Sequence, residues 1–564
     1  MKKVILSMIG VVVIVLAVNQ IFVSKISIEQ VKSKLKATVY TSSDNNKKTN
    51  IQTGIDTSIL NTQKKVESDI LSESKGSTLE KPYIKLDPFG NSPLSAIVIF
   101  DTPSDSKVSF KVKGKDSSVD IKDTIDKYET HHEIPILGLY PDYKNTVEIT
   151  STSKSGEVTS NTITIQTGKL PKYIPAVTIK KADKENMEIV KNGLTFTVPS
   201  TKYPIGFDAN GDIRWYSSRY NSHVFKLLKN GHLLFLSKDS NSGNAYNRLF
   251  EIDFTGKAYN VYKLSQTNSM SETSDIEKTL VHHDAIELPS GNLLLTVSDG
   301  GGRYVEDTMI EMDRRTGSIV KTIDLKDILP KSFYENYDNT KRDDGLIDWF
   351  HQNALVYDDR DNSIIISGRN QDMVMKLDYK TNKIVWILAD PTGWPKEYQK
   401  YLIKGVGDNF KYTGGQHAPI ILPETAADNN KDTVDLLLFD NNVAVSRGNQ
   451  SLSEKYSAGS QYRINEKTKT AELVWTYGSE RGTSLFSNII GSNRFMPNTG
   501  NRLIDFGWID SGTKSDIVEV TDEAQPRVVF EAILSDFPTG SWAYRAERFS
   551  LYPDNWVFKV SDEE

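Results

Sequence analysis

Four of the chain's eight histidines occupy the same position of a repeated sequence pattern, which makes them the first candidates for chemistry. His417 follows a Gly-Gly-Gln turn in "KYTGGQHAPIILPE" and begins an apolar stretch. His283 begins "HDAIELPSGNLLL" and His351 begins "HQNALVYDDRDNSIIISGR" in the same manner. His223 begins "HVFKLLKNG" and is the weakest member, because its neighbours are not distinctive.

Two spacings support this alignment. His223 and His283 each lie eight residues before a glycine, and His283 and His417 each lie six residues before a proline. Residues at one position of a structural repeat share one side of the assembled fold, so these imidazoles are expected to converge. The corresponding places in the last two repeats carry Ser492 or Asn493 and a residue near Ala546.

Arg369, in "SIIISGRN", adds a guanidinium to the candidate site. Arginine binds tetrahedral oxyanions through paired hydrogen bonds. A neutral imidazole is a nucleophile towards sulfur or phosphorus, and further imidazoles can exchange protons with a phenol oxygen. Three histidines could also hold a metal ion, but the charge of Arg369 disfavours a cation, so no metal and no cofactor are expected. One such histidine alone is more often a structural polar cap, whereas three or more converging on an arginine favour a functional site.

The composition excludes several classes of protein. The net charge is −6 and no long basic block is present, which argues against a nucleic-acid partner. The chain has no cysteine, so disulfides, thiolate metal sites and a cysteine-linked lipid anchor are excluded. With 564 residues the chain is too long for one ordinary domain.

Residues 1–25 have the pattern of a signal anchor or a signal peptide. Lys2 and Lys3 precede about twenty mostly apolar residues, enough for one membrane-spanning helix. The best cleavage candidate, at residues 16–18, lacks the small-x-small pattern, which favours an uncleaved anchor over a cleaved signal. We expect an exported protein, anchored in the cell membrane with its catalytic part outside the cytoplasm, or secreted. Residues 26–80 are polar and are expected to form a linker.

The remaining chain is expected to be all-β, with two domains. Residues 82–170 contain short alternating segments such as "KVSFKVKG" and "NTVEITSTS", which predict a small β-sandwich. His131 and His132 fall at a strand start there and are interpreted as surface or edge residues. Residues 175–564 contain six copies of a hinge followed by an apolar strand, such as "DRRTGSIVKTIDL", which predict a six-bladed β-propeller.

The ends of this repeat array indicate how the ring would close. "YPDNWVFKV" stands alone at the C-terminus, and the first hinge-strand, near Asp208 in the blade that begins near Ile205, lacks a partner before it. We expect these two segments to pair, because closure removes exposed sheet edges. The first strand of each blade would then run beside the central channel, with the histidines at one mouth.

Three long insertions lead into the strands of the candidate site. They occupy residues 325–350, 389–416 and 477–495 and are rich in Tyr, Trp and Phe. These aromatic side chains are expected either to pack within the insertions or to wall a pocket for a flat aromatic substrate.

Three segments resemble bacterial arylsulfate sulfotransferases, enzymes that do not use the usual nucleotide sulfate donor. They are "VHHDAIELPSGNLLL", "DWFHQNALVYDDRDNSIIISGR" and "GGQHAPIILPE" followed by "LLLFDN". The resemblance covers residues 85–564 and implies transfer of a sulfuryl group between phenols through a sulfohistidine. It implies that His417 is sulfated, that His283, His351 and Arg369 assist, and that Asn353 contacts the substrate. His283 is preferred over His282 because its offsets match those of His417, although "HHDAI" against "HQNAL" favours His282.

The expected mechanism is a two-step exchange without a cofactor, between a phenolic sulfate donor and a phenol acceptor. Either His283 or His351 would donate a proton to the departing phenolate. Two alternatives remain open: a hydrolase with water as acceptor at the same site, and a non-catalytic surface propeller that binds an anionic or aromatic ligand. The oligomeric state is also open, with a homodimer among the options.

Overall fold

The computed structural model describes residues 50–238, 246–266, 280–298, 302–337, 345–424, 427–428, 430–537, 540 and 542–561. The expected signal or anchor segment, residues 1–25, lies outside this part of the chain. Strands dominate the described residues, and no helix among them has the length and apolar character to span a membrane. The expected all-β class is confirmed.

An N-terminal sandwich-type domain forms around one long central strand. β3 (Ala96–Val112) pairs with β2 (Tyr83–Leu86), β4 (Ile121–Ile136) and β5 (Lys144–Ser153), and β5 pairs with β6 (Val158–Gln166). Burial alternates residue by residue along β5, as the two-residue period of a strand requires. Val147 and Ile149 therefore point into the core while their neighbours lie nearer the surface.

The two histidines of this domain lie on β4 and face different environments. His131 is exposed and its Nδ1 lies 2.7 Å from Asp101 Oδ1. His132 is buried, and its Nε2 lies 3.0 Å from Thr102 Oγ1. His131 is thus a surface residue as expected, whereas His132 packs inside this domain.

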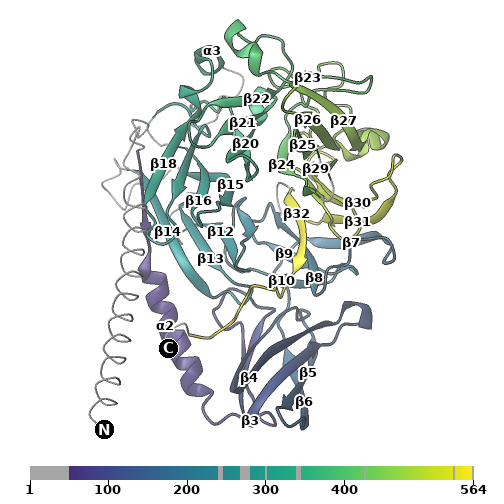
Figure 1. Cartoon of the computed structure of the whole chain (residues 1–564). Helices are drawn as coiled ribbons and strands as arrows, with labels where there is room; N and C mark the ends of the chain where they lie inside the picture. The colour runs from purple at the N-terminus through teal and green to yellow at the C-terminus, as the bar shows by residue number, and fades with distance from the viewer. Residues whose placement is uncertain are drawn as a thin grey trace, which may run out of the picture. The chain divides into compact units, whose positions relative to one another are not determined.

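Six further sheets, all mainly antiparallel, follow the sandwich and give a propeller-like arrangement (Figure 1). The first sheet has the order β32 (Ala543–Ser550), β8 (Gly193–Pro199), β9 (Ile205–Phe207) and β10 (Ile213–Tyr216). The second has the order β11 (Phe225–Leu227), β12 (Leu233–Ser237), β13 (Arg248–Ile252), β14 (Ala258–Gln266) and β1 (Ile51–Ile55). The third has the order β15 (Val281–Glu287), β16 (Leu293–Val297), β17 (Thr308–Met312) and β18 (Ile319–Asp324).

The other three sheets follow the same order from first to last strand. The fourth contains β19 (Gln352–Asp358), β20 (Ser363–Gly368), β21 (Met373–Asp378) and β22 (Ile384–Leu388). The fifth contains β24 (His417–Ile421), β25 (Thr433–Asp440), β26 (Ala458–Asn465), β27 (Thr470–Tyr477) and, parallel to β27, β23 (Lys404–Gly405). The sixth contains β28 (Ser492–Phe495), β29 (Arg502–Ile509), β30 (Lys514–Val520), β31 (Val528–Ser535) and β7 (Ala176–Ala182).

The repeated sequence has two direct structural causes. The Asn-Gly or Gly-Asn pair makes the tight turn between first and second strands, where Gly231 and Gly291 adopt φ of +82° and +83°. That left-handed conformation favours glycine. The apolar run that follows, such as Leu293–Val297 in β16, is buried at every residue, because neighbouring sheets cover both of its faces.

The chain's C-terminal part closes the first sheet, but with a different strand from the one expected. β32 (drawn in yellow) pairs along β8 from Ala543↔Pro199 to Ser550↔Gly193 (Figure 1). Residues 552–560 form no strand; Phe558 and Val560 instead pack with Ile97 and Ile99 of the sandwich-type domain. The prediction that "YPDNWVFKV" closes the ring is therefore wrong, because β32 already occupies the free edge of β8.

The expectation that residues 26–80 form a linker is wrong for the second half of this range, which contains a strand and a helix. β1 pairs with β14 as the last strand of the second sheet, and α2 (Thr57–Glu73) follows it. Asp56 caps α2 by accepting a hydrogen bond from the Ser58 N–H. Ile51 and Ile70 are buried. Such isolated apolar residues in a polar stretch are therefore the sequence feature that could have indicated this strand and helix.

The closing strand leads to a prediction about C-terminal truncation. A chain ending at Tyr552 keeps β32 and is expected to fold, with a lower melting temperature. It loses the burial of Phe558 and Val560, which contributes about 1.5–3 kcal/mol for each side chain. A chain ending before β32 leaves the β8 edge unpaired and is expected to remain unfolded. Circular dichroism melts check both; a cooperative melt of the shorter chain would contradict the closure.

Candidate active site

The candidate histidines lie where the first strands of the sheets begin, and those strand starts share an irregular backbone. Strand pairing slips between Val281 and Ala285, and equivalent slips occur in β19, β24 and β32. His283 and His351 adopt φ of +25° and +53°, in the left-handed region that non-glycine residues rarely occupy. Bulges of this type re-aim a side chain away from its regular strand direction. The repeat therefore presents its imidazoles at the strand starts.

His417 is held in one tautomer by two acceptors. Its Nδ1 lies 2.6 Å from Asn441 Oδ1 and 3.0 Å from the Gly415 carbonyl oxygen. The Asn441 amide NH₂ donates to the Ser487 and Ile490 carbonyls, so its oxygen must face His417. Nδ1 consequently carries the proton and Nε2 carries the lone pair. Burial and the charges of Arg369 and His351 hold the pKa of His417 well below its usual range.

The Gly-Gly-Gln turn before His417 is built to fix this ring. A Cβ on Gly414 would lie 2.8 Å from the Val443 carbonyl oxygen, and Gly415 adopts φ of +62°. The Gly415 N–H donates to Asp372, and the Gln416 amide donates to the Met373 carbonyl, both bonds being buried. The turn therefore needs these residue types in this order.

His351 has the opposite protonation state. Its Nδ1 donates to Asp348 Oδ2 at 2.5 Å and lies 2.9 Å from Glu306 Oε2. Burial alone would lower the pKa of His351, but these two carboxylates outweigh it and raise the pKa to about 10. His351 is therefore an imidazolium at neutral pH, and its Nε2 also carries a proton.

His283 lies between the other histidines of the repeat. Its ring centroid is 4.4 Å from that of His351 and 5.0 Å from that of His223. Burial and the charge of His351 hold the pKa of His283 well below its usual range. His282 is buried, with its Nδ1 3.1 Å from that of His283. Of this pair, His283 is the residue whose ring contacts the neighbouring sheets' histidines.

Arg369 and Asn353 have different surroundings. The Arg369 guanidinium donates to Asn370 Oδ1 at 2.8 Å and to the Asn488 carbonyl at 3.3 Å. Within the part of the chain that the structure describes, no carboxylate pairs with Arg369, so its charge is available to an anion. Asn353 is fully buried and its amide donates to the Gln416 carbonyl at 2.8 Å. Asn353 thus ties β19 to the residue before His417.

Three functional contacts were missed in the sequence. Asp348 lies three residues before His351 in "DWFHQN", which is the only local signal for it. Glu306 precedes β17 and Asn441 follows β25, so neither shares the repeat position of the histidines. The two acids and the histidines have donor atoms within 4.8 Å of one another, in the groups His282–His283–Glu306 and Glu306–Asp348–His351. By distance alone, these groups could hold a metal ion.

The aromatic insertions mostly pack against themselves. Phe333, Trp349 and Trp394 are buried in one cluster, and the rings of Phe333 and Trp394 lie 4.8 Å apart. A different group of rings lies beside His223: Trp542 is nearly parallel to it at 5.8 Å and Tyr544 meets it edge-on at 4.6 Å. The insertions were expected either to pack internally or to wall a substrate pocket. Phe333, Trp349 and Trp394 pack internally.

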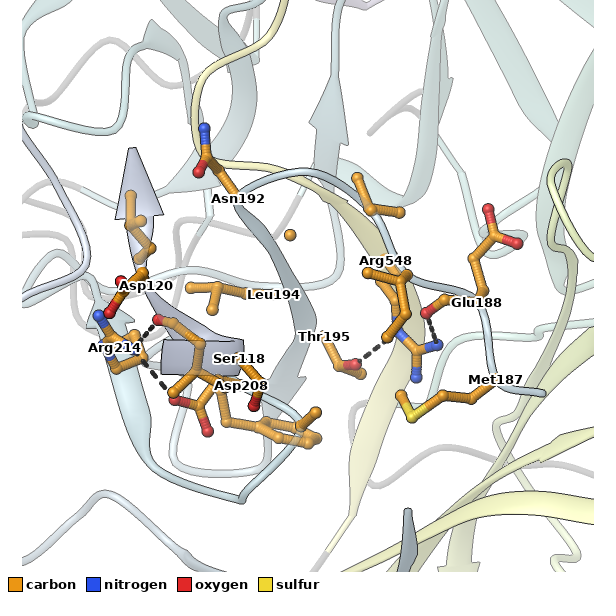
Figure 2. A pocket seen from close by; sticks show the side chains of 17 residues that line it. Ser118, Asp120, Met187, Glu188, Asn192, Leu194, Thr195, Asp208, Arg214 and Arg548 are labelled. Carbon is orange, nitrogen blue, oxygen red and sulfur yellow. Dashed lines mark hydrogen bonds and ion pairs between the residues drawn. The ribbon is translucent and has the colours of Figure 1, made fainter. Parts of the chain in front are cut away.

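Two cavities lie away from these histidines. One, of about 600 Å³, runs along the first strands and is lined by Lys226, Asp284 and Arg545, of which Asp284 pairs with both cations. The other, of about 70 Å³, lies around the start of β8 (Figure 2). Its two guanidinium groups are already paired, Arg214 with Asp208 and Arg548 with Glu519. No histidine is among the described residues that line either cavity.

Comparisons with known proteins assign the family. A family model described as arylsulfotransferase matches residues 179–545, and one described as the arylsulfotransferase Ig-like domain matches residues 83–168. The chain belongs to the arylsulfotransferase family. It is therefore an enzyme of aryl sulfate transfer, which sets aside the non-catalytic alternative.

Two relatives are described as arylsulfate sulfotransferase AssT. The protein of Escherichia coli O6:H1 is 25% identical over 574 residues, covering 82% of this chain and 91% of the relative. That of Lelliottia amnigena is 26% identical over 502 residues, covering 72% and 81%. Among solved structures, the periplasmic gluconolactonase PpgL of Pseudomonas aeruginosa is 10% identical with a TM-score of 0.32, covering 79% of this chain and 100% of that chain. A similarity with so low a TM-score gives no information about the function of this chain.

The charge on His351 can be tested by removing a carboxylate. The pKa of His351 is raised in the folded state above its unfolded value of about 6.5, so its ion pairs stabilise the fold fully below that pH. This stabilisation is lost as pH rises through about 10. In Asp348→Asn we expect the pKa to fall towards 6.5 and the loss of stability above neutral pH to become smaller. Histidine NMR titration and pH-dependent melts measure both.

Asp359→Asn, on the exposed hairpin between β19 and β20, is the matched control and should leave the His351 titration unchanged. An Asp348→Asn protein in which His351 titrates as in the parent protein would contradict the ion pair.

Proposed function

We propose that this enzyme transfers a sulfuryl group from a phenolic sulfate ester to a phenol by a ping-pong mechanism through a sulfohistidine at His417. The observation that carries the proposal is the pair of opposite charge states in one site. His417 is neutral with its lone pair on Nε2, and His351 is an imidazolium. A nucleophile and a proton donor are thus present together before substrate binds.

In the first half-reaction, the Nε2 lone pair of His417 attacks sulfur and the bond from sulfur to the phenolic oxygen breaks. The leaving oxygen takes the Nε2 proton of His351 and departs as a phenol. Arg369 binds the sulfuryl oxygens, where charge is spread in the transition state. The His417 ring becomes positively charged when sulfated, and its Nδ1–H bonds to Asn441 and Gly415 stabilise that charge.

In the second half-reaction, the acceptor phenol gives its proton to His351 Nε2 and its oxygen attacks sulfur. The N–S bond breaks and its electron pair returns to His417, while the product leaves as a sulfate ester. One phenol is exchanged for another, so the reaction needs no oxidant and no nucleotide. His351 is preferred over His283 as the proton donor because their pKa values are shifted in opposite directions.

We also propose that the six sheets form a closed ring of six blades around the site. The first strands contact one another in sequence, β15 with β19, β19 with β24, β24 with β28, and β28 with β32. His223, just before β11, contacts both His283 and Tyr544 and so links the second sheet to its two neighbours.

We also propose that the protein is exported, because Lys2 and Lys3 precede about twenty mostly apolar residues at the N-terminus. The site would then act on phenols outside the cytoplasm. Protection of the protein from protease added to intact cells would rule this location out.

The proposed nucleophile leads to a prediction for His417→Ala. With 4-nitrophenyl sulfate, we expect the parent protein to acquire the mass of one SO₃ group on the peptide containing His417. The variant should release no nitrophenol, even in a burst, because the first step needs the nucleophile. His131→Ala, which removes an exposed histidine of the sandwich-type domain, is the control and should keep full activity. Transfer by His417→Ala at the parent rate would exclude the mechanism.

The same experiment separates transfer from hydrolysis. A second phenol should be converted to its sulfate ester and should speed release of the first phenol. Release of inorganic sulfate alone, with no ester formed, would favour the hydrolase.

Arg369→Gln provides the prediction for charge stabilisation. Both half-reactions should slow, on the order of a hundredfold or more, because one preorganised positive group is lost from the transition state. The melting temperature should not fall, since the charge of Arg369 has no described carboxylate partner. Stopped-flow measurement of each half-reaction tests this; an effect on one half-reaction only would assign Arg369 a different role.

A further inference from the structure

Lys202 is held rigidly beside the strand start that carries His223. It lies in the turn between β8 and β9 with φ of +68°, a conformation that non-glycine residues rarely adopt. Its N–H donates to the Pro199 carbonyl at 2.8 Å, and its carbonyl accepts from the Asn221 N–H at 2.7 Å. Asn221 is fully buried and lies two residues before His223. The turn therefore fixes Lys202 against the second sheet.

The Lys202 ammonium points at rings and a hydroxyl. Nζ lies 4.1 Å from the Trp542 ring centroid and 5.9 Å from that of Tyr246. It also lies 3.4 Å from Ser222 Oγ, which is 2.8 Å from His223 Nδ1. Since the His223 ring contacts the His283 ring, Lys202 is joined to the candidate active site through a short series of contacts.

Lys202 is a largely buried cation without a counter-ion. Among the residues that the structure describes, no carboxylate lies within ion-pair distance of its Nζ. Two other largely buried lysines of this chain are paired with carboxylates, Lys376 with Asp358 and Lys326 with Asp307. Burial alone lowers the pKa of Lys202, to about 7. An uncompensated buried charge destabilises a fold, so the fold itself gives no reason for this lysine.

The rings around Lys202 differ from those of the insertions in being partly exposed. Trp542, Tyr203, Tyr220 and Tyr246 are all half-buried, whereas Trp349 and Phe350 of the insertion are fully buried. Tyr220 and Tyr246 are stacked with centroids 5.3 Å apart. Flat, partly exposed rings that border a histidine cluster are suited to contact with an aryl group.

We propose that Lys202, Trp542 and Tyr246 form a subsite for aryl substrates that carry an anionic group remote from the reacting oxygen. The inference rests on the proposed function, which places the sulfuryl group between His417 and Arg369. In this proposal Arg369 and Lys202, each without a carboxylate partner among the described residues, bind the two anionic groups of the substrate. The ring would lie against the aromatic faces, and the remote carboxylate or sulfate would accept hydrogen bonds from the Lys202 ammonium.

The test compares acceptors of different charge with one donor, 4-nitrophenyl sulfate. The acceptors are 4-hydroxyphenylacetate, which is anionic, 4-ethylphenol, which is neutral, and tyramine, which is cationic. The parent protein should have the highest kcat/KM for the anionic acceptor. In Lys202→Met the ratio of anionic to neutral kcat/KM should fall about ten- to hundredfold, the usual effect of losing a hydrogen bond to a charged group. A sulfated acceptor, hydroquinone monosulfate, shows whether sulfate replaces carboxylate.

Two variants serve as controls. Lys202→Arg keeps the charge and should retain part of the preference, whereas Lys180→Met removes an exposed lysine of β7 and should retain all of it. Lys202→Met should also melt at an equal or higher temperature, because an uncompensated charge has been removed. A lower melting temperature with an unchanged acceptor ratio would make Lys202 a structural residue and overturn the proposal.

The proposal can fail separately from the proposed function. Calorimetry measures the affinity of 4-hydroxyphenylacetate for the protein without any sulfuryl transfer. Lys202→Met should weaken this affinity about ten- to hundredfold. If the parent protein transfers sulfuryl groups but binds anionic and neutral phenols equally, the subsite is wrong while the mechanism stands. If Lys202→Met slows transfer to all three acceptors by one factor, Lys202 acts in the transfer step and the subsite is also wrong.

Discussion

The site depends on keeping two imidazoles in opposite charge states within one buried region. Burial disfavours the charged form of both, so the difference must come from their partners. Two carboxylates face His351, whereas His417 faces an amide oxygen, a carbonyl and the positive charge of Arg369. The charge of His351 itself helps to keep His417 neutral. One arrangement of charges therefore sets the protonation states of both the proposed acid, His351, and the proposed nucleophile, His417.

The backbone that supports this arrangement is irregular at the strand starts. Regular strands would alternate their side chains between neighbouring sheets, because successive residues point to opposite faces. The slips in pairing at β15, β19, β24 and β32 break that alternation where the imidazoles are needed. Strand cores that are buried at every residue, such as β16, are rigid enough to hold the left-handed residues next to them.

The histidines could be found in the sequence because strand register preserves their offset from the turn glycine or proline. Glu306, Asp348 and Asn441 could not, since they lie outside that register and reach the site only when different sheets meet. The closing strand was misplaced because residues 552–560 copy the turn and apolar run of the repeat, whereas residues 543–550 have no such pattern. Only the pairing with β8 identifies residues 543–550 as the closing strand. Likewise β1 and α2 carry a few apolar residues in a polar stretch, and their burial depends on β14, some two hundred residues away.

The position of β32 also determines when the site can first exist. Its Tyr544 hydroxyl donates to the His283 carbonyl, and its Arg545 guanidinium donates to the Asn353 carbonyl and to Asp284. Among the described residues, β32 is the last strand along the chain, whereas the residues that it supports are synthesised much earlier. A nascent chain synthesised only as far as β31 would therefore contain every imidazole of the candidate site but not the strand that orders two of their neighbouring segments. Assembly of the candidate site is in this way coupled to the synthesis of β32.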